Sequence, residues 1–129
     1  MTVELKYLTL VTLLTALIWI PYILNVFVVR GLLDTVGYPE HPKPLAPWAS
    51  RMRAAHYNAV ENLVVFAALV LTAHVLSVKS EATALACVTY FWARVVHLLA
   101  YTFRVPWVRT LAFVVGWVCQ LVLALAILG

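Results

Sequence analysis

The stretch Arg51–Asn62 combines two arginines, a histidine, two asparagines and a carboxylate, and residues 63–71 after it are almost purely apolar. Ionisable groups cost about a few kcal/mol or more in hydrocarbon, so they usually face a bundle interior, a cavity or a partner. Asn58 and Glu61 are three residues apart, which places them on one face of a helix, and His56 precedes them. The stretch is therefore a candidate site for a polar ligand.

A second polar stripe lies in a later apolar segment. Arg94, His97 and Tyr101 are spaced at three and four residues, so they share one helix face. Arg94 is near the middle of its segment, which is the worst depth for a lone cation. Glu61 is the only carboxylate expected to enter the membrane from the same side. We therefore predict a Glu61–Arg94 ion pair, either as a structural pair that fixes helix register or as part of a ligand site.

Arginines crowd the ends of the expected helices on the same side as these residues. They are Arg30, Arg51, Arg53, Arg104 and Arg109. Because arginine binds carboxylates through a bidentate fork, such a rim suits an anionic small molecule whose other end dips into the bilayer. The alternative is a topology signal combined with contacts to anionic lipids.

Other reactive residue types indicate no further chemistry. Cys87 and Cys119 lie in apolar runs without metal-ligand spacing or a CxxC motif, so we expect them to be small buried residues. His41 and His74 are isolated from any second ligand, and we predict no metal site. The net charge of +4 comes from basic residues at helix ends, which argues against a nucleic-acid partner.

The elements that must position these residues are membrane-spanning helices. Of the 129 residues, 65% are hydrophobic and 11% are charged, which excludes a soluble domain of this size. Four stretches approach the roughly 20 residues that cross a bilayer. They cover about residues 7–29, with a kink at Pro21, and about residues 55–78, 81–103 and 106–128. The short links between the last three predict antiparallel neighbours, so residues 1–129 form one all-α domain, an antiparallel four-helix transmembrane bundle.

The one substantial loop, residues 30–54, is punctuated by prolines. Lysine and arginine flank this loop and the 103–106 link, whereas only Lys6 and Lys79 lie on the other side. The positive-inside rule then places both links in the cytoplasm and both termini on the opposite side. We expect an integral protein of a bacterial inner membrane, in contact with membrane lipids.

Two motifs resemble those of the MAPEG family, the membrane-associated proteins in eicosanoid and glutathione metabolism. The first is Arg51-x-Arg53-x-Ala55-His56-x-Asn58-x-x-Glu61-Asn62, which is similar to the second-helix signature of the family. The second is Ala93-Arg94-Val-Val-His97-Leu-Leu-Ala100-Tyr101 followed by Pro106 and Arg109, which is similar to its third-helix signature. The resemblance extends over essentially the whole chain and is closest to a short, bacterial-type member.

This resemblance implies a homotrimer that binds glutathione between protomers at the cytoplasmic side. Asn58 and Glu61 match positions that hold the glutathione backbone, with Glu61 suited to its amino group. The other matches in the binding pocket are Arg30, Arg51, Arg53, His97 and Tyr101. Arg109 matches the arginine that stabilises the glutathione thiolate. The departures are Ala54 in place of a second arginine, Phe113 in place of a tyrosine, and a different Tyr101–Arg109 spacing that keeps Arg104 as a rival for the catalytic role.

We therefore expect a glutathione-dependent membrane enzyme, of the microsomal transferase or peroxidase type, that takes glutathione as co-substrate. Its second substrate would be a lipophilic electrophile or lipid hydroperoxide, as in lipid metabolism or detoxification. One alternative is a non-catalytic lipid-binding or scaffold protein of the same fold. Another is a small multidrug-type transporter in which Glu61 carries protons. The arginine and asparagine neighbours of Glu61 favour fixed recognition over proton transport.

Overall fold

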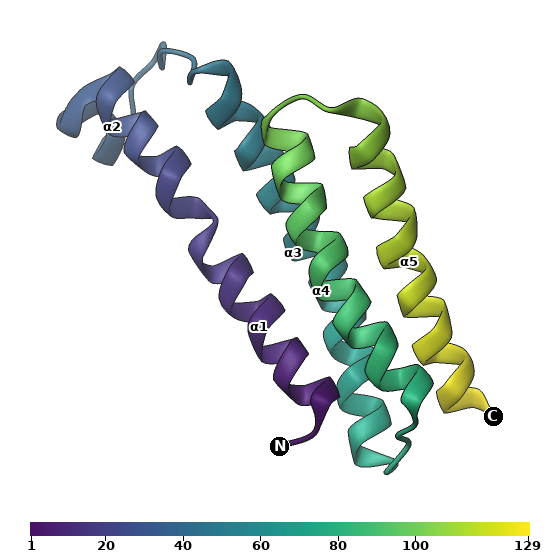
Figure 1. The fold of residues 1–129 in the computed structure, drawn as a ribbon. Helices are drawn as coiled ribbons and strands as arrows, with labels where there is room; N and C mark the ends of the chain where they lie inside the picture. Colours follow the sequence, from purple (N-terminus) through teal and green to yellow (C-terminus); the bar gives the residue numbers. More distant parts are fainter.

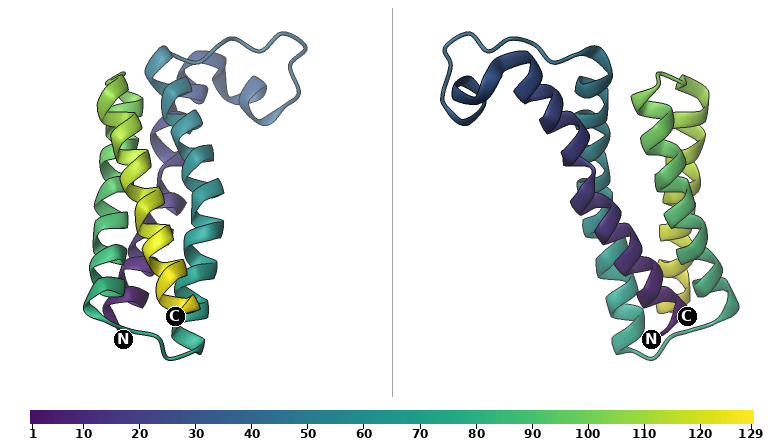
Figure 2. Two further views of the ribbon diagram at one scale, coloured as in Figure 1. Left: turned by 90° about the vertical axis from the view of Figure 1, so that its right-hand side faces the viewer. Right: turned by 60° about the vertical axis from the view of Figure 1, so that its left-hand side comes forward.

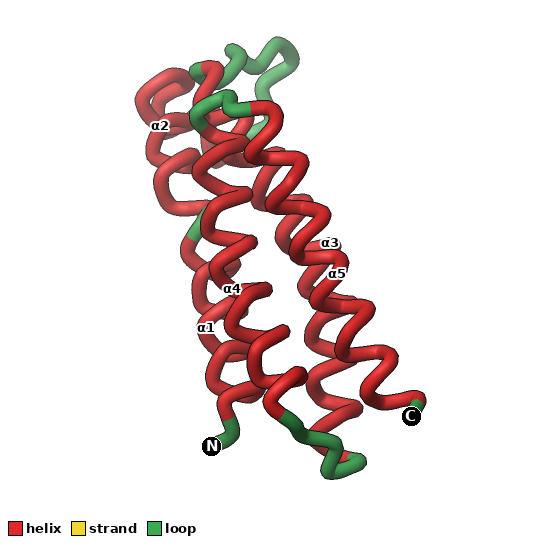
Figure 3. The backbone as a smooth tube through the Cα atoms, turned by 45° about the vertical axis from the view of Figure 1, so that its right-hand side comes forward, coloured by secondary structure: helices red, strands yellow, loops and turns green.

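All regular structure in this protein is helical, in a computed structural model that describes residues 1–129 (Figure 1). The helices are α1 (Val3–Leu17), α2 (Trp19–Val36), α3 (Pro47–Val75), α4 (Glu81–Thr102) and α5 (Pro106–Leu128). Since α1 and α2 together form one span, four segments are long and apolar enough to cross a membrane. They alternate in direction, with both termini at one end of the bundle (Figures 1 and 3). The predicted all-α, antiparallel four-helix bundle is confirmed.

The first span is interrupted where α1 passes into α2. The break falls at Ile18, three residues before Pro21. Proline has no amide hydrogen, so the carbonyl of Leu17, four residues earlier, cannot receive its helical hydrogen bond. The expected proline kink is therefore a short break in the helix, and toward its far end the first span leans away from α4 and α5, while α2 stays packed against α3 (Figure 2).

A second change of direction occurs at Gly31, whose φ of 77° is a left-handed value that side chains disfavour. Residues 32–36 leave the axis of α2 there, and the chain up to residue 46 projects sideways from the bundle (Figure 2). Three hydrogen bonds tie this segment to α2, from Arg30 Nε to the Lys43 carbonyl (2.8 Å), from the Ala46 amide to Asn25 Oδ1 (3.0 Å) and from Thr35 Oγ1 to the Val26 carbonyl (3.4 Å).

The long predicted loop at residues 30–54 is wrong at both boundaries, because α2 continues to Val36 before the loop and α3 starts early after it. Helix α3 begins at Pro47, not at residue 55, and residues 47–54 form its first two turns. Proline suits the first helical position because its missing amide hydrogen would have no partner there. The early start makes α3 29 residues long and places Arg51 and Arg53 within it.

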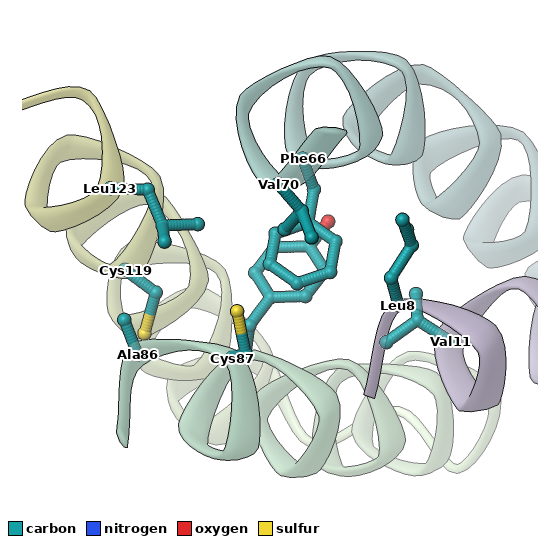
Figure 4. Packing of buried hydrophobic residues seen from close by; sticks show 9 residues of the cluster. Leu8, Val11, Phe66, Val70, Ala86, Cys87, Cys119 and Leu123 are labelled. Atoms are coloured by element: carbon teal, nitrogen blue, oxygen red, sulfur yellow. The ribbon is translucent and has the colours of Figure 1, made fainter. Parts of the chain in front are cut away.

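The main apolar core lies toward the end of the bundle that carries both termini. It contains residues from all four spans: Leu8, Val11, Phe66, Val70, Ala86, Cys87, Tyr90, Cys119 and Leu123 (Figure 4). The rings of Phe66 and Tyr90 stack at its centre, with centroids 3.8 Å apart. Both cysteines are free and buried here, as predicted.

Helices α4 and α5 make the most extensive helix pair of the bundle. Small residues lie buried in α4 at intervals of seven, namely Ala86, Ala93 and Ala100, and α5 also buries small residues, at Ala112 and Gly116. Such residues let two membrane helices approach closely. A Cβ atom at Gly116 would lie 3.6 Å from the Tyr90 ring and 3.9 Å from Cδ of Arg94. These are ordinary van der Waals distances, so Gly116 lies directly against the Tyr90 ring and the Arg94 side chain.

Candidate functional site

A polar cavity opens between α3, α4 and α5 in the half of the bundle nearer the α4–α5 loop, which we call the arginine-rich end. Its volume is about 340 Å³, and its walls are Asn58 from α3, His97 and Tyr101 from α4, and Arg109, Thr110 and Phe113 from α5. The His97 side chain is buried and packs edge-on against the Tyr101 ring, with centroids 5.7 Å apart. Four residues predicted from separate motifs therefore share one cavity.

A second cavity, the rim cavity, adjoins the first at the arginine-rich end. It measures about 360 Å³ and is lined by Arg51, Ala100, Tyr101, Arg104, Val105, Pro106 and Arg109. Tyr101 and Arg109 line both cavities, so the two spaces meet at this pair. Arg109 Cζ lies 5.0 Å from the centroid of the Tyr101 ring, which is a cation–π contact that holds the guanidinium at the junction.

The other two arginines of the rim cavity are tied to the end of α4. Arg51 Nε donates to the carbonyl of Thr102 (2.9 Å), which is one of the helix's free terminal carbonyls. Arg104 has a φ of 61° and occupies the left-handed position just after α4, where glycine is usual. The Val105 amide closes this turn onto the Ala100 carbonyl (2.8 Å). Arg104 lines only the rim cavity, whereas Arg109 reaches both.

Beneath the polar cavity lies a buried network of amides around one cation. Arg94 is only 4% exposed, and its Nη2 donates to Asn58 Oδ1 at 2.7 Å. One turn further along α3, Asn62 Nδ2 lies 2.9 Å from the Asn58 carbonyl and 3.4 Å from the same Oδ1. Gln120 of α5 donates to the Asn62 carbonyl (3.2 Å). The network links α3, α4 and α5 and sets the position of Asn58.

The predicted Glu61–Arg94 ion pair is not formed within the chain. Arg94 hydrogen bonds with Asn58 instead, and the Glu61 side chain is exposed. Three residues advance a helix by about 300°, so Glu61 points roughly 60° away from Asn58 and out of the bundle. It shares this outer face of α3 with Tyr57 and Val64, which are 58% and 68% exposed. Asn58 and Glu61 therefore lie on neighbouring sides of α3 and not on one face, and this difference in direction leaves Asn58, not Glu61, beside Arg94.

Two predicted site residues, Arg30 and Arg53, and His56 of the first motif lie away from the two cavities. Arg53 is two residues after Arg51, which turns it to another side of α3. Arg30 belongs to the segment that projects from the bundle and donates to the Lys43 carbonyl. His56 Nδ1 lies 2.8 Å from the hydroxyl oxygen of Tyr22, and the two rings thereby join α2 to α3. Within one chain, Arg30, Arg53 and Glu61 are thus not part of either cavity.

Sequence reasoning missed Thr110, Phe113 and Gln120 as parts of the site. Phe113 is four residues after Arg109, so helical spacing could have placed it on the same side of α5. Thr110 follows Arg109 directly and is turned by about 100°, so spacing gave no signal for it. Gln120 is the one polar side chain in the apolar run from Leu111 to the end of the chain, and such a residue usually faces the bundle interior. Asn62 was part of the first motif without an assigned role.

Together the cavities offer hydrogen-bond donors and positive charge to a ligand. Arg51, Arg104 and Arg109 bring guanidinium groups, and no carboxylate lines either space. Volumes near 350 Å³ each are at the lower end of small-molecule sites, and the two spaces join at Arg109. The arrangement can bind an anionic molecule that extends from the arginine-rich end toward the hydrocarbon.

The fold and cavities define an integral membrane protein, a bundle of four spans with an arginine at the junction of two polar spaces. The chain belongs to the MAPEG family, because the model of that family matches residues 8–129, nearly the whole length. The resemblance found in the two motifs is thereby confirmed. No curated protein matches the chain.

Proposed function

We propose that this protein is a glutathione-dependent membrane enzyme that adds the tripeptide to lipophilic electrophiles or uses it to reduce lipid hydroperoxides. The observation that carries the proposal is the position of Arg109, held on the Tyr101 ring where the two cavities meet. Membership of the MAPEG family supports it, since that family includes glutathione transferases and peroxidases.

The residues of the cavities fit the groups of glutathione. The tripeptide carries two carboxylates, which suit the guanidinium groups of Arg51 and Arg104 in the rim cavity. Its thiol would lie near Arg109. A free thiol has a pKa of about 8.5 and is mostly protonated at neutral pH, and a nearby guanidinium favours the nucleophilic thiolate. Arginine does this without taking up the proton, because its own pKa is above about 12.

The reaction then follows from the thiolate. With an aryl halide, the sulfur–carbon bond forms, the halide leaves with the bonding electron pair, and the thiol proton passes to water. With a hydroperoxide, two glutathione molecules are oxidised to the disulfide while the hydroperoxide is reduced to an alcohol and water. The apolar substrate would approach from the membrane along α5, where Phe113 and Trp117, 38% and 51% exposed, lie one turn apart.

The test is glutathione binding and turnover by the purified protein in detergent. We expect calorimetry to detect saturable binding of glutathione, and a generic aryl halide to be conjugated faster with the protein than without it. Ophthalmic acid, which lacks the sulfur, should bind but not react. Absence of glutathione binding would contradict the proposal and favour a scaffold or lipid-binding role.

We propose further that the protein is a homotrimer with the arginine-rich end in the cytoplasm of a bacterial inner membrane. Glu61 supports a partner, because it is the midpoint of the 29-residue α3 and points out of the bundle. A carboxylate facing lipid at that depth is costly, so a second copy is the natural cover for this face. The family resemblance likewise implies that glutathione binds between protomers, with Glu61 suited to its amino group.

This assembly is tested by light scattering in detergent. We expect a protein mass equal to three chains for the parent and a lower mass for Glu61→Lys, which reverses the charge on the covered face. Glu81→Lys is the matched control, since Glu81 is exposed in the first turn of α4 at the other end of the bundle. A monomeric parent, or a Glu61→Lys variant that remains trimeric, would count against the covered face.

A further inference from the structure

The orientation of the Asn58 amide carries an inference that rests on the proposed function and deepens it. Asn58 is half-buried between the polar cavity and the buried Arg94. An asparagine amide offers an oxygen acceptor on one branch and a nitrogen donor on the other. Which branch faces the cavity decides whether the protein presents a donor or an acceptor to the ligand at this point.

Arg94 decides this orientation. A guanidinium has five N–H donors and no acceptor, so only the amide oxygen of Asn58 can lie 2.7 Å from Arg94 Nη2. The amide nitrogen of Asn62 approaches the same oxygen at 3.4 Å. Two donors therefore hold the oxygen on the protein side, and the reversed amide would set nitrogen against nitrogen at both contacts.

The amide nitrogen of Asn58 consequently lies on the branch away from Arg94, in a residue that lines the cavity, and it is not among the buried atoms that lack a partner. It makes no hydrogen bond within the chain, although the carbonyl and the amide oxygen of the same residue are both engaged. His97, Tyr101 and Arg109 line the cavity beside it. The polar cavity is therefore lined by Asn58, whose amide nitrogen is a free donor, and by Arg109, its one charged residue, which can also only donate.

We infer that Arg94 is a positioning residue that turns the Asn58 nitrogen into the polar cavity, so that this position binds a carbonyl or carboxylate oxygen of the ligand and rejects an amine. For glutathione, the group at Asn58 is then a peptide carbonyl or a carboxylate. The free amino group of the tripeptide must find its partner elsewhere, and Glu61 of a second copy is the carboxylate available for it.

The substitution Asn58→Asp tests whether the amide oxygen or the amide nitrogen of Asn58 faces Arg94. The aspartate keeps an oxygen for Arg94 and replaces the cavity-facing donor with a second acceptor. We expect the Kd for glutathione, measured by calorimetry, to rise at least about tenfold, while the midpoint of thermal denaturation stays at or above that of the parent. Glutathione bound as tightly as by the parent, or more tightly, would overturn the inference, because the ligand would then present a donor to residue 58.

The same change one turn along α3 is the matched control. Asn62 uses its nitrogen toward the protein, so Asn62→Asp loses hydrogen bonds and should lower the denaturation midpoint. A midpoint for Asn58→Asp that falls as far as that of Asn62→Asp would show that the Asn58 oxygen does not face Arg94. The denaturation midpoints are measured without ligand, so this comparison tests the amide orientation independently of glutathione. Failure of the parent protein to bind glutathione would overturn the proposed function and leave the orientation to be judged from the midpoints.

Two variants of Arg94 test its positioning role. Lysine retains a donor-only side chain, whereas methionine, of similar length, leaves Asn58 free to turn. We expect the Kd for glutathione to stay within about threefold of the parent for Arg94→Lys and to rise about fivefold or more for Arg94→Met. Equal values of Kd in the two variants would contradict positioning by Arg94.

Discussion

Replacing Arg109 with alanine should lower the kcat of aryl halide conjugation by about 100-fold or more at neutral pH. Removing one group that stabilises developing or full negative charge in a protected site typically costs about 10²–10³ in rate. Arg109 is the one arginine that lines both cavities, and the Tyr101 ring holds it in place. Without it, the pKa of the bound thiol should rise toward about 8.5, so the thiolate would be scarce at pH 7.

The pH dependence distinguishes this role from a general loss of structure. The Arg109→Ala variant should recover activity as the pH is raised toward the pKa of the unassisted thiol, because more of the thiol is then ionised without help from a guanidinium. Arg104→Ala is the matched control, and we expect it to lose less than about fivefold, since Arg104 lines only the rim cavity. An equal loss at every pH would contradict action on the thiol. A larger loss for Arg104→Ala would transfer the catalytic assignment to Arg104.

Hydrophobic runs and short links were sufficient to predict the spans, because both depend on local composition. The starts of α4 and α5, at Glu81 and Pro106, lie where the links end. The start of α3 was mistaken because prolines were taken to exclude a helix, whereas Pro47 begins one. The turn at Gly31 had no clear signal, since a left-handed φ at glycine becomes visible only in three dimensions.

The sequence motifs predicted which residues line the site, but not which side chains pair with one another. Helical spacing brought His97 and Tyr101 to one face, and the structure adds Asn58 and Arg109 from other helices. The partner of Arg94 was not predictable, because opposite charge suggested Glu61 while side-chain direction selected Asn58. Glu61 and Asn58 differ in direction by about 60° around α3, and which of them faces Arg94 depends on how α3 is rotated against α4 and α5.

The second large effect concerns stability. Replacing Asn58 with leucine should destabilise the protein by about 3 kcal/mol, because Arg94 would remain buried without an acceptor for its Nη2. Asn58 provides the one hydrogen bond that the Arg94 side chain makes, and Nε already lacks a partner. We expect a clear fall in the thermal denaturation midpoint in detergent, and a smaller fall for Thr9→Leu, which makes a similar change at an exposed position of α1.

Removing the cation should reverse the loss. In Asn58→Leu/Arg94→Met the buried charge is gone and two apolar side chains of similar volume fill the space, an exchange that is often neutral or stabilising for buried polar pairs. The double variant should therefore be more stable than Asn58→Leu alone, although it should no longer bind glutathione at residue 58. Additive losses in the double variant would mean that Asn58 acts through packing, and that the guanidinium of Arg94 finds its stabilisation from another part of the protein.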